Sequence, residues 1–311
     1  MKLSIISPAF NEEDVLQFFL NRAQKVCESL VDDKSIEDYE ILTIDDGSTD
    51  NTWQIIIANY QRDFRIKGIK LSRNFGQHMA LTAGLDNVSG DLIVLMDSDL
   101  QDEPEKIPSM IEKLLDGYDI VYAVRRKRCD SFYKKFVSGA FYKFFSLVST
   151  FELRKDVGIY RILTRQVVEN VTDLRECSRM INALTEWVGF RVGFIELERP
   201  GRFRGTTKYN LIKMIKLAVE GVTSFSLVPL RIATYFGFIV ALFSFFLAIY
   251  FVGLKITVGN EFAGWPSLIT SILFLGGIQL IALGVIGEYI GKIFMEVKKR
   301  PLYIISEKLI K

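Results

Sequence analysis

The residues best suited to chemistry lie between Asp97 and Asp102, directly after the apolar run Leu92 to Met96. A short unbroken apolar run is typical of a strand buried on both faces, and open α/β sheets bind ligands at the carboxyl ends of their strands. Carboxylates two residues apart can share one Mg²⁺ or Mn²⁺, which keeps its other positions for water and phosphate. We therefore expect a metal site formed by Asp97, Asp99 and Gln101. For an isolated Asp-x-Asp, the alternative is a solvated acidic turn.

These acids need a scaffold, and strand and helix patterns alternate before them and after them. Strands are expected over Leu3–Ser7, Glu40–Ile44, Ile66–Leu71, Leu92–Met96 and Asp119–Val124, and helices over Asp14–Leu30, around Trp53–Ile57, and over Gln77–Leu85 and Ile107–Leu115. This alternation predicts an α/β fold with a mostly parallel sheet covered on both faces. Polar clusters follow three of the strands and should gather along one edge of the sheet. No GxGxxG occurs, which argues against a dinucleotide-binding enzyme.

Composition narrows the class of protein further. The net charge of +2 over 311 residues gives no reason to expect a nucleic-acid partner. The three cysteines, Cys27, Cys129 and Cys177, are far apart and form no CxxC, which favours a reducing compartment over a disulfide framework or a zinc site. The N-terminus reads as a strand that breaks at Pro8, and its apolar run is too short for a signal peptide.

The C-terminal third of the chain predicts a membrane anchor. Ile232–Leu254 and Ser267–Gly287 carry no charged residue, and each reaches the ~20 residues that a span needs. Basic residues flank this pair of runs on both sides, so the positive-inside rule places the catalytic domain and both termini in the cytoplasm. We expect a multi-pass protein of the inner (plasma) membrane. Glycines at 277, 284, 287 and 291 favour close helix packing and a homo-oligomer, although glycine is also simply common in membrane helices.

Two further segments have amphipathic patterns. Phe132–Phe151 combines a broad aromatic stripe with basic residues, which predicts a helix in the membrane interface; the alternative is a core helix with a solvated basic edge. Asn210–Phe225 is a second candidate. We expect a globular domain over 1–208 that includes the interfacial helix, a juxtamembrane helix over 209–230, a transmembrane hairpin over 231–291, and a basic cytoplasmic tail over 292–311.

Three strand-end motifs carry a family resemblance. Ser7–Glu13 (SPAFNEE), Asp45–Asp50 (DDGSTD) and Asp97–Asp102 (DSDLQD) resemble the motifs of family 2 glycosyltransferases, which have the GT-A fold. Segments farther along the chain resemble the polyprenyl-phosphate glycosyltransferases, a group that contains dolichol-phosphate mannose synthases and, most similar, bactoprenol glucosyltransferases. These segments are Ser72–Gly76, Glu186–Gly189, Gly205–Tyr209, Glu220–Ser226, Gly287–Lys292 and Lys298–Tyr303. The resemblance covers essentially the whole chain.

The resemblance implies an enzyme that transfers a hexose, with inversion, from a nucleotide sugar to undecaprenyl (polyprenyl) phosphate at the cytoplasmic membrane face. The product would be a lipid-linked sugar for cell-envelope glycosylation. UDP-glucose is the favoured donor, with UDP-GlcNAc and GDP-mannose as alternatives, and Mg²⁺ or Mn²⁺ is the implied cofactor. Asp46 takes the family's position for base or ribose recognition. The donor pocket would be lined by Ser7, Ala9, Phe10, Glu12, Asp46, Asn74, Gly76, Asp97 and Ser98.

The acceptor phosphate is largely ionised already, since its second pKa is ~6. The enzyme must therefore mainly offset the repulsion between two anions. Arg125, Arg161, Arg202 and Lys208 suit this task, because guanidinium forks match phosphate oxygens. Asp99 is also assigned a catalytic role, because it would help to hold the metal. Asp156 occupies the first position of the family's Asp-x-Gly-Asp-Phe-Arg motif, where it could take a proton or position the acceptor.

Several features weigh against parts of this assignment. Ile159 and Tyr160 replace the second Asp and the Phe of that motif. His78, the only histidine, is expected to be structural, because no base is needed. A processive polysaccharide synthase would carry Gln-x-x-Arg-Trp, which is absent here, and more than two spans. A non-catalytic, membrane-anchored nucleotide-binding scaffold is the other alternative; Ile159 supports it and the intact Asp-x-Asp opposes it.

Overall fold

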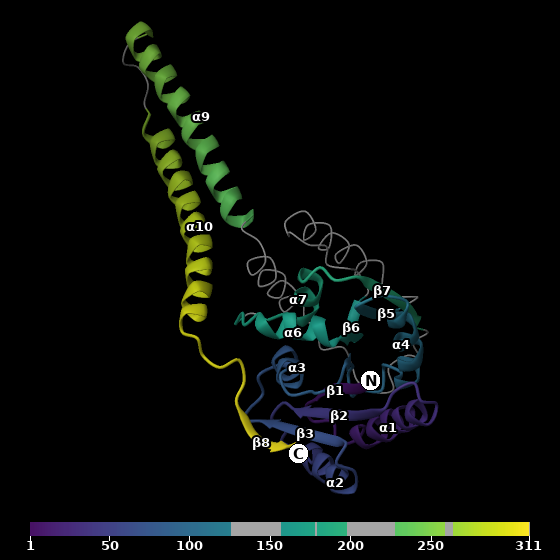
Figure 1. Cartoon of the computed structure of the whole chain (residues 1–311). Coiled ribbons are helices and arrows are strands. Elements are labelled where there is room, and N and C mark those ends of the chain that lie inside the picture. The colour runs from purple at the N-terminus through teal and green to yellow at the C-terminus, as the bar shows by residue number, and fades with distance from the viewer. Residues whose placement is uncertain (126–156, 178, 198–227, 259–263, 311) are drawn as a thin grey trace. The chain divides into compact units, whose positions relative to one another are not determined.

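The computed structural model describes residues 1–125, 157–177, 179–197, 228–258 and 264–310 (Figure 1). The chain forms two compact units. One contains the strands, together with the tail that begins at Pro301, and the other contains the two long helices. The interfacial helix expected over 132–151 and the juxtamembrane helix expected over 209–230 lie outside the described residues, apart from the last three residues of the latter range.

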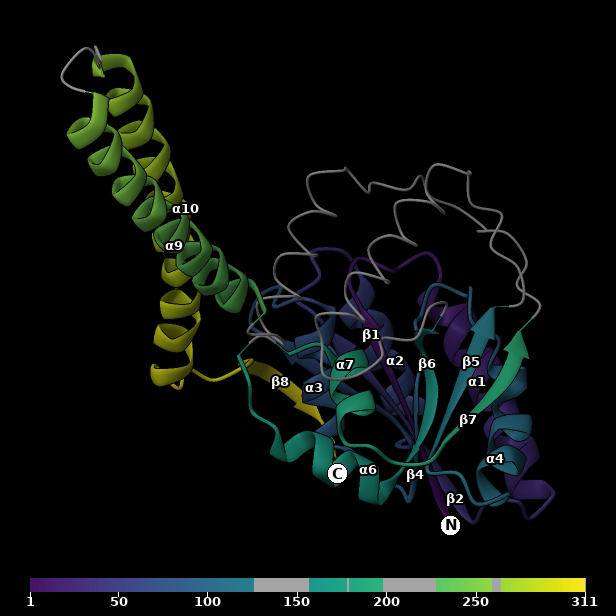
Figure 2. The same ribbon diagram turned by 90° about the horizontal axis from the view of Figure 1, so that it is seen from above.

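The first unit is built on one eight-stranded sheet. Its strands, in the order in which they lie, are β7 (Val192–Leu197), β5 (Ile120–Arg125), β6 (Val157–Thr164), β4 (Leu92–Leu95), β1 (Lys2–Ala9), β2 (Asp38–Asp45), β3 (Ile66–Leu71) and β8 (Ile305–Leu309). The four neighbours β4, β1, β2 and β3 run parallel. Because their carboxyl ends meet at one edge, the loops that follow these four strands come together there (Figure 2).

Helices cover both faces of the sheet. On one face lie α1 (Leu16–Asp32), α2 (Thr52–Arg62), the short 3₁₀ turn η1 (Pro104–Lys106) and α4 (Ile107–Leu115), which share a core with Leu3, Ile5 and Ile41. On the other lie α3 (Gln77–Leu85), α6 (Arg165–Asp173) and α7 (Ile181–Trp187), which contact one another. Gly84 lets α3 approach β1 closely, since a Cβ there would lie 2.3 Å from Ile6 Cγ2.

The second unit contains α9 (Val228–Val258) and α10 (Trp265–Val297), which pack against each other. Both helices are long and apolar enough to cross a membrane, over Val228–Leu247 and Thr270–Val297. They include the two uncharged runs found in the sequence. Their large apolar side chains, among them Phe238, Phe243 and Leu280, are exposed in the isolated chain.

The α/β class and the mostly parallel sheet predicted from the sequence are confirmed. β3, α3 and α4 coincide with the predicted ranges. Beyond prediction, the tail contains β8, which pairs antiparallel with β3 and completes the sheet. β6 is antiparallel to both of its neighbours, so the sheet is mixed on that side.

A buried ion pair stabilises the amino ends of the strands, away from the edge where the loops gather. Glu40 is 1% exposed and accepts hydrogen bonds from Ser4 Oγ, Lys67 Nζ and Ser89 N, each at 2.6 Å. Burial alone would raise the pKa of the Glu40 carboxyl, but the hydrogen bonds from Lys67, Ser4 and Ser89 outweigh it and lower the pKa to about 2. The charged form of Glu40 therefore favours the folded state.

We predict that Glu40→Gln lowers the free energy of unfolding by about 3 kcal/mol at pH 7, because Lys67 loses its buried partner. The stabilising effect of a carboxylate with a depressed pKa is complete above its unfolded value of about 4.5. It is lost as the pH falls towards 2. The difference in melting temperature between wild type and variant, measured on the full chain in detergent, should therefore shrink between pH 5 and pH 3.

Glu37→Gln is the matched control. The Glu37 side chain is 88% exposed and pairs only with the N-terminal ammonium at 2.9 Å, so its loss should change the melting temperature little at any pH. A Glu40→Gln protein with a wild-type melting temperature at pH 7 would contradict this account of the buried pair.

Candidate active site

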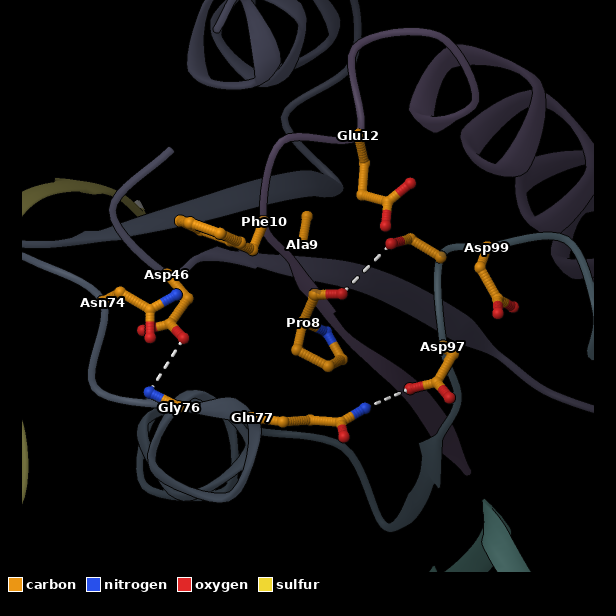
Figure 3. Close-up of a pocket in the computed structure, with 11 residues that line it drawn as sticks. Pro8, Ala9, Phe10, Glu12, Asp46, Asn74, Gly76, Gln77, Asp97 and Asp99 are labelled. Carbon is orange, nitrogen blue, oxygen red and sulfur yellow. Dashed lines mark hydrogen bonds between the residues drawn. The ribbon is translucent and has the colours of Figure 1, made fainter. Parts of the chain in front are cut away.

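A cavity of about 370 Å³ opens at the carboxyl ends of the four parallel strands (Figure 3). Each strand contributes the residues that directly follow it or end it. The lining residues are Pro8, Ala9, Phe10 and Glu12 from β1, Asp46 from β2, Asn74, Gly76 and Gln77 after β3, and Asp97, Ser98 and Asp99 after β4. The cavity is thus a product of sheet topology, because the four segments are far apart in the sequence.

Backbone hydrogen bonds continue past the strand ends and fix the start of each loop. Asp46 N donates to Ala9 O at 2.9 Å, and Met96 N donates to Ile6 O at 3.1 Å. Ser98 Oγ donates to Pro8 O at 3.1 Å, which ties the acidic turn after β4 to the end of β1. The cavity wall is therefore held by the same ladder that holds the sheet.

The cavity has two distinct ends. Figure 3 shows Phe10 and Asn74 beside Asp46 at one end, Asp97 and Asp99 at the other, and Pro8 between them. The Phe10 ring is 45% exposed. The first end offers an aromatic ring, an amide and a carboxylate, and the second offers hard carboxylate oxygens.

Asp46 shapes the first end by holding the loop that follows β3. Its Oδ1 accepts a hydrogen bond from Phe75 N at 2.7 Å, and its Oδ2 accepts one from Gly76 N at 2.9 Å. Burial raises the pKa of Asp46, and these two hydrogen bonds only partly offset that effect. Gly76 has φ +95 and caps α3, a conformation that favours glycine.

Gly47 lets the same loop lie close to β2. A Cβ at Gly47, which has φ +74, would lie 2.5 Å from the Arg73 carbonyl carbon. Any larger residue would push the loop away. The DDGSTD motif therefore acts here through a carboxylate that anchors the loop and a glycine that leaves room for it.

At the second end, Asp97 and Asp99 follow β4, and Glu12 lies near enough to Asp99 to feel its charge. Asp97 Oδ1 accepts a hydrogen bond from Gln77 Nε2 at 2.6 Å, and Asp99 Oδ1 accepts one from Gln101 N at 3.0 Å. Burial, followed by the charge of Asp99, raises the pKa of Glu12. The described residues contain no group of three or more acids, histidines or cysteines that could bind a metal unaided. Asp97 and Asp99 fit a divalent ion whose remaining positions are filled by water or a diphosphate.

Four predicted residues in the described part of the chain do not line the cavity: Ser7, Gln101, Arg125 and Arg161. Ser7 is fully buried, and Gln101 contributes its backbone N–H to Asp99 but does not line the cavity. Arg125 ends β5. His78 does not line the cavity either, and burial lowers its pKa to about 4, so it is neutral at physiological pH. Asp156, Arg202 and Lys208 lie outside the described residues.

Arg161, predicted to bind phosphate, is fully buried. Its guanidinium donates to the carbonyls of Gly158 and Ile159, to Thr185 Oγ1 at 2.6 Å and to Asn182 Oδ1, and it lies 4.7 Å from the Tyr122 ring centroid. These contacts fix the start of β6, directly after Asp156, against α7. Tyr160, which replaces the family's Phe, uses its hydroxyl to donate to Glu103 O at 2.7 Å.

Pro8 and Gln77 line the cavity, although neither was predicted from the sequence as a site residue. Pro8 lies inside a recognised motif, and its carbonyl holds Ser98. Gln77 is the first residue of α3 and follows directly after the Asn74–Gly76 turn. The signal that could have found it is this position, because the first residues of a helix beside a strand end face the same edge.

Comparison with known proteins agrees with this geometry. Residues 4–181 match the family described as Glycosyl transferase family 2. A bactoprenol glucosyl transferase of Shigella phage SfII is 42% identical over 99% of this chain and 98% of its own length. A prophage bactoprenol glucosyl transferase homolog of Escherichia coli K12 is 43% identical over 98% of this chain and 99% of its own. An uncharacterized glycosyltransferase of Synechocystis is 42% identical over 99% of this chain and 95% of its own.

The segments at the ends of the four parallel strands, the cavity that they form and the full-length similarity lead to one conclusion. The chain belongs to glycosyl transferase family 2 and is a glycosyltransferase.

Proposed function

We propose that this enzyme transfers a hexose, with inversion, from a nucleotide sugar to a polyprenyl phosphate such as undecaprenyl phosphate. UDP-glucose is the donor that we favour. The observation that carries the proposal is the two-ended cavity at the strand ends, in a chain similar over its full length to proteins named bactoprenol glucosyl transferase. The product would be a lipid-linked sugar for the cell envelope.

The cavity's two ends match the two halves of a nucleotide sugar. A base can stack on the exposed Phe10 ring, as aromatic side chains commonly allow, while Asn74 and Asp46 offer polar atoms beside it. The diphosphate then points towards Asp97 and Asp99. This orientation leaves the sugar near the acidic turn after β4, where transfer would occur.

The charge of the cavity supports a divalent cation in the reaction. Its lining contains the four acids Glu12, Asp46, Asp97 and Asp99, and none of the described residues that line it is Lys, Arg or His. Among these described residues, a diphosphate would meet only negative charge. Mg²⁺ or Mn²⁺ held by Asp97 and Asp99 would neutralise the leaving diphosphate as a Lewis acid. The acids of this chain would hold and orient that ion.

The acceptor half of the proposal rests on sequence. Arg125, Arg202 and Lys208 are the basic residues that we assign to the lipid phosphate, and Asp156 would position it. Arg161 holds the start of β6 directly after Asp156, so we assign it a positioning role for that carboxylate. Bringing two anions together is then a task shared by the metal and these cations.

The lipid acceptor requires a membrane, and α9 and α10 are long and apolar enough to provide the anchor. We propose that they form a hairpin with both termini in the cytoplasm, on the basis of the basic residues that flank it. A cysteine placed near Asn260 should then react with an impermeant reagent outside intact cells. Labelling at the C-terminus instead would reverse the topology.

The direct test is a panel of sugar nucleotides offered to the purified full-length protein with undecaprenyl phosphate. We expect UDP-glucose to give a lipid-linked hexose and free UDP, and UDP-GlcNAc and GDP-mannose to give much less. Arg202→Ala serves as the acceptor-site variant: at saturating donor its turnover should fall about 10- to 100-fold, the effect of one lost hydrogen bond to a charged group.

Turnover of GDP-mannose alone would contradict the favoured donor and leave the reaction class intact. Growth of a polymer would favour a processive synthase. Nucleotide binding without transfer to any polyprenyl phosphate would favour a non-catalytic scaffold and overturn the proposal.

A second prediction concerns the metal. Asp97→Asn or Asp99→Asn should lower transfer at least about 100-fold, because neutralisation of the leaving group contributes several kcal/mol. EDTA should have the same effect, and added Mg²⁺ or Mn²⁺ should reverse it. Asp116→Asn, a change at a side chain that is 63% exposed, is the control and should leave transfer unchanged. Full activity in EDTA would remove the metal from the mechanism.

A further inference from the structure

The tail that follows α10 is built into the catalytic unit. β8 pairs antiparallel with β3, in a register that runs from Gly68 opposite Leu309 to Leu71 opposite Ile305. Without β8, β3 would be an open edge of the sheet. The pairing continues one step beyond both strands, where Ser72 N donates to Ile304 O at 2.9 Å.

Side chains reinforce this pairing. Glu307 Oε2 accepts a hydrogen bond from Nε1 of the buried Trp53 at 3.1 Å. Ser306 Oγ donates to Lys70 O at 3.1 Å, and Lys308 Nζ donates to Asn87 Oδ1 at 2.7 Å. The tail thus contacts α2, β3 and the segment after α3 at the same time.

Tyr303 contacts the catalytic unit through its side chain. Its hydroxyl donates to Asp86 Oδ2 at 2.7 Å. The Asp86 carboxylate also accepts hydrogen bonds from both terminal nitrogens of Arg175, at 2.8 and 2.9 Å. Burial, followed by the hydrogen bond to Asp86, raises the pKa of Tyr303, so the hydroxyl keeps its proton and remains a donor. Asp86 is the C-cap of α3. Tyr303 therefore docks on one end of α3, while Gln77 at the other end lines the cavity.

The two elements that the tail contacts, β3 and α3, are joined by the loop that forms one wall of the cavity. The loop 72–76 connects β3 to α3, and Asn74 and Gly76 in that loop line the cavity. On the cavity side the loop is fixed by Asp46. On the other side it is fixed by Ile304 O and, through α3, by Tyr303. Ordering the loop from either side lowers the entropy that must be lost to order it from the other.

We propose that Tyr303–Leu309 is a positioning element of the donor cavity, so that docking of this tail and binding of the nucleotide stabilise each other. The inference rests on the proposed function only in taking the cavity to bind a nucleotide. By linkage, nucleotide must strengthen tail docking by the same factor by which tail docking strengthens nucleotide affinity. The segment that joins the membrane anchor to the catalytic unit would then also set donor affinity.

The first test uses the unmodified full-length protein in detergent. Amide hydrogen exchange over 303–310 should slow about fivefold or more when saturating UDP and Mn²⁺ are added, as typical couplings predict. GDP is run alongside as the alternative nucleotide. Unchanged exchange over 303–310 with a bound nucleotide overturns the inference.

The second test is calorimetry on Tyr303→Ala and Tyr303→Phe. Tyr303→Ala should raise the Kd for UDP about fivefold or more, while kcat at saturating donor stays within about twofold of wild type. Tyr303→Phe keeps the ring, loses the hydroxyl with its hydrogen bond to Asp86, and should give a smaller rise. Tyr60→Phe on α2, whose ring packs edge-on against Phe64 at 5.3 Å, is the matched control and should leave the Kd unchanged.

If Tyr303→Ala does not fold, Tyr303→Phe and the exchange experiment still test the inference. A wild-type Kd in a folded Tyr303→Ala protein overturns the inference and leaves the proposed function standing. If tail docking and nucleotide binding are coupled but the protein transfers no sugar to polyprenyl phosphate, the proposed function is contradicted and this inference stands. A wild-type protein that binds neither UDP nor GDP overturns both.

Discussion

The hydrogen bonds from Phe75 N and Gly76 N to the Asp46 carboxylate are the interaction on which the site depends. Parallel strands bring their ends to one edge, but they do not by themselves fix the loops that leave that edge. Asp46 is 4% exposed, so leaving these two N–H groups unpaired there would cost about 1–3 kcal/mol each. That penalty keeps the loop after β3 in place. The loop in turn presents Asn74 and starts α3, whose first residue holds Asp97.

The distribution of charged side chains around the cavity determines what the cavity can bind. On the proposed function, acids surround a space that takes up an anionic donor, so the donor would need a cation to enter and the lipid phosphate would need cations of its own. The proposal assigns these tasks to different parts of the chain. Carboxylates from the strand ends face the cavity, whereas the basic residues that we assign to the acceptor are Arg125, at the end of β5, and residues of the segment 198–208. Buried Arg161 donates its hydrogen bonds to β6 and α7 and does not line the cavity, so we assign it a positioning role in the proposal.

Much of this could be predicted from the sequence because the signals are local. Apolar runs such as Leu92–Met96 identify buried strands, and polar residues that follow them must meet at one edge. Ala9, Phe10, Asp46, Asn74 and Asp97 were expected in the donor pocket, and they line the same cavity. β8 could not be predicted, because Ile305–Leu309 has three polar residues in five and reads as a basic tail until β3 is known to lack a neighbour. The burial of Arg161 could not be predicted either, because it depends on how α7 packs against β6.

The most direct test of the account is the affinity of Asp46→Asn for UDP, measured by calorimetry on the full-length protein with Mn²⁺. Asparagine has one acceptor oxygen in place of two, so one of the two loop N–H groups must lose its partner. We predict that the Kd rises about tenfold or more, equivalent to about 1.4 kcal/mol, while the melting temperature falls by only a few degrees. Asp38→Asn, at the other end of β2 with a side chain 54% exposed, should bind UDP as the wild type does. An unchanged Kd in Asp46→Asn would contradict the claim that this carboxylate builds the donor cavity.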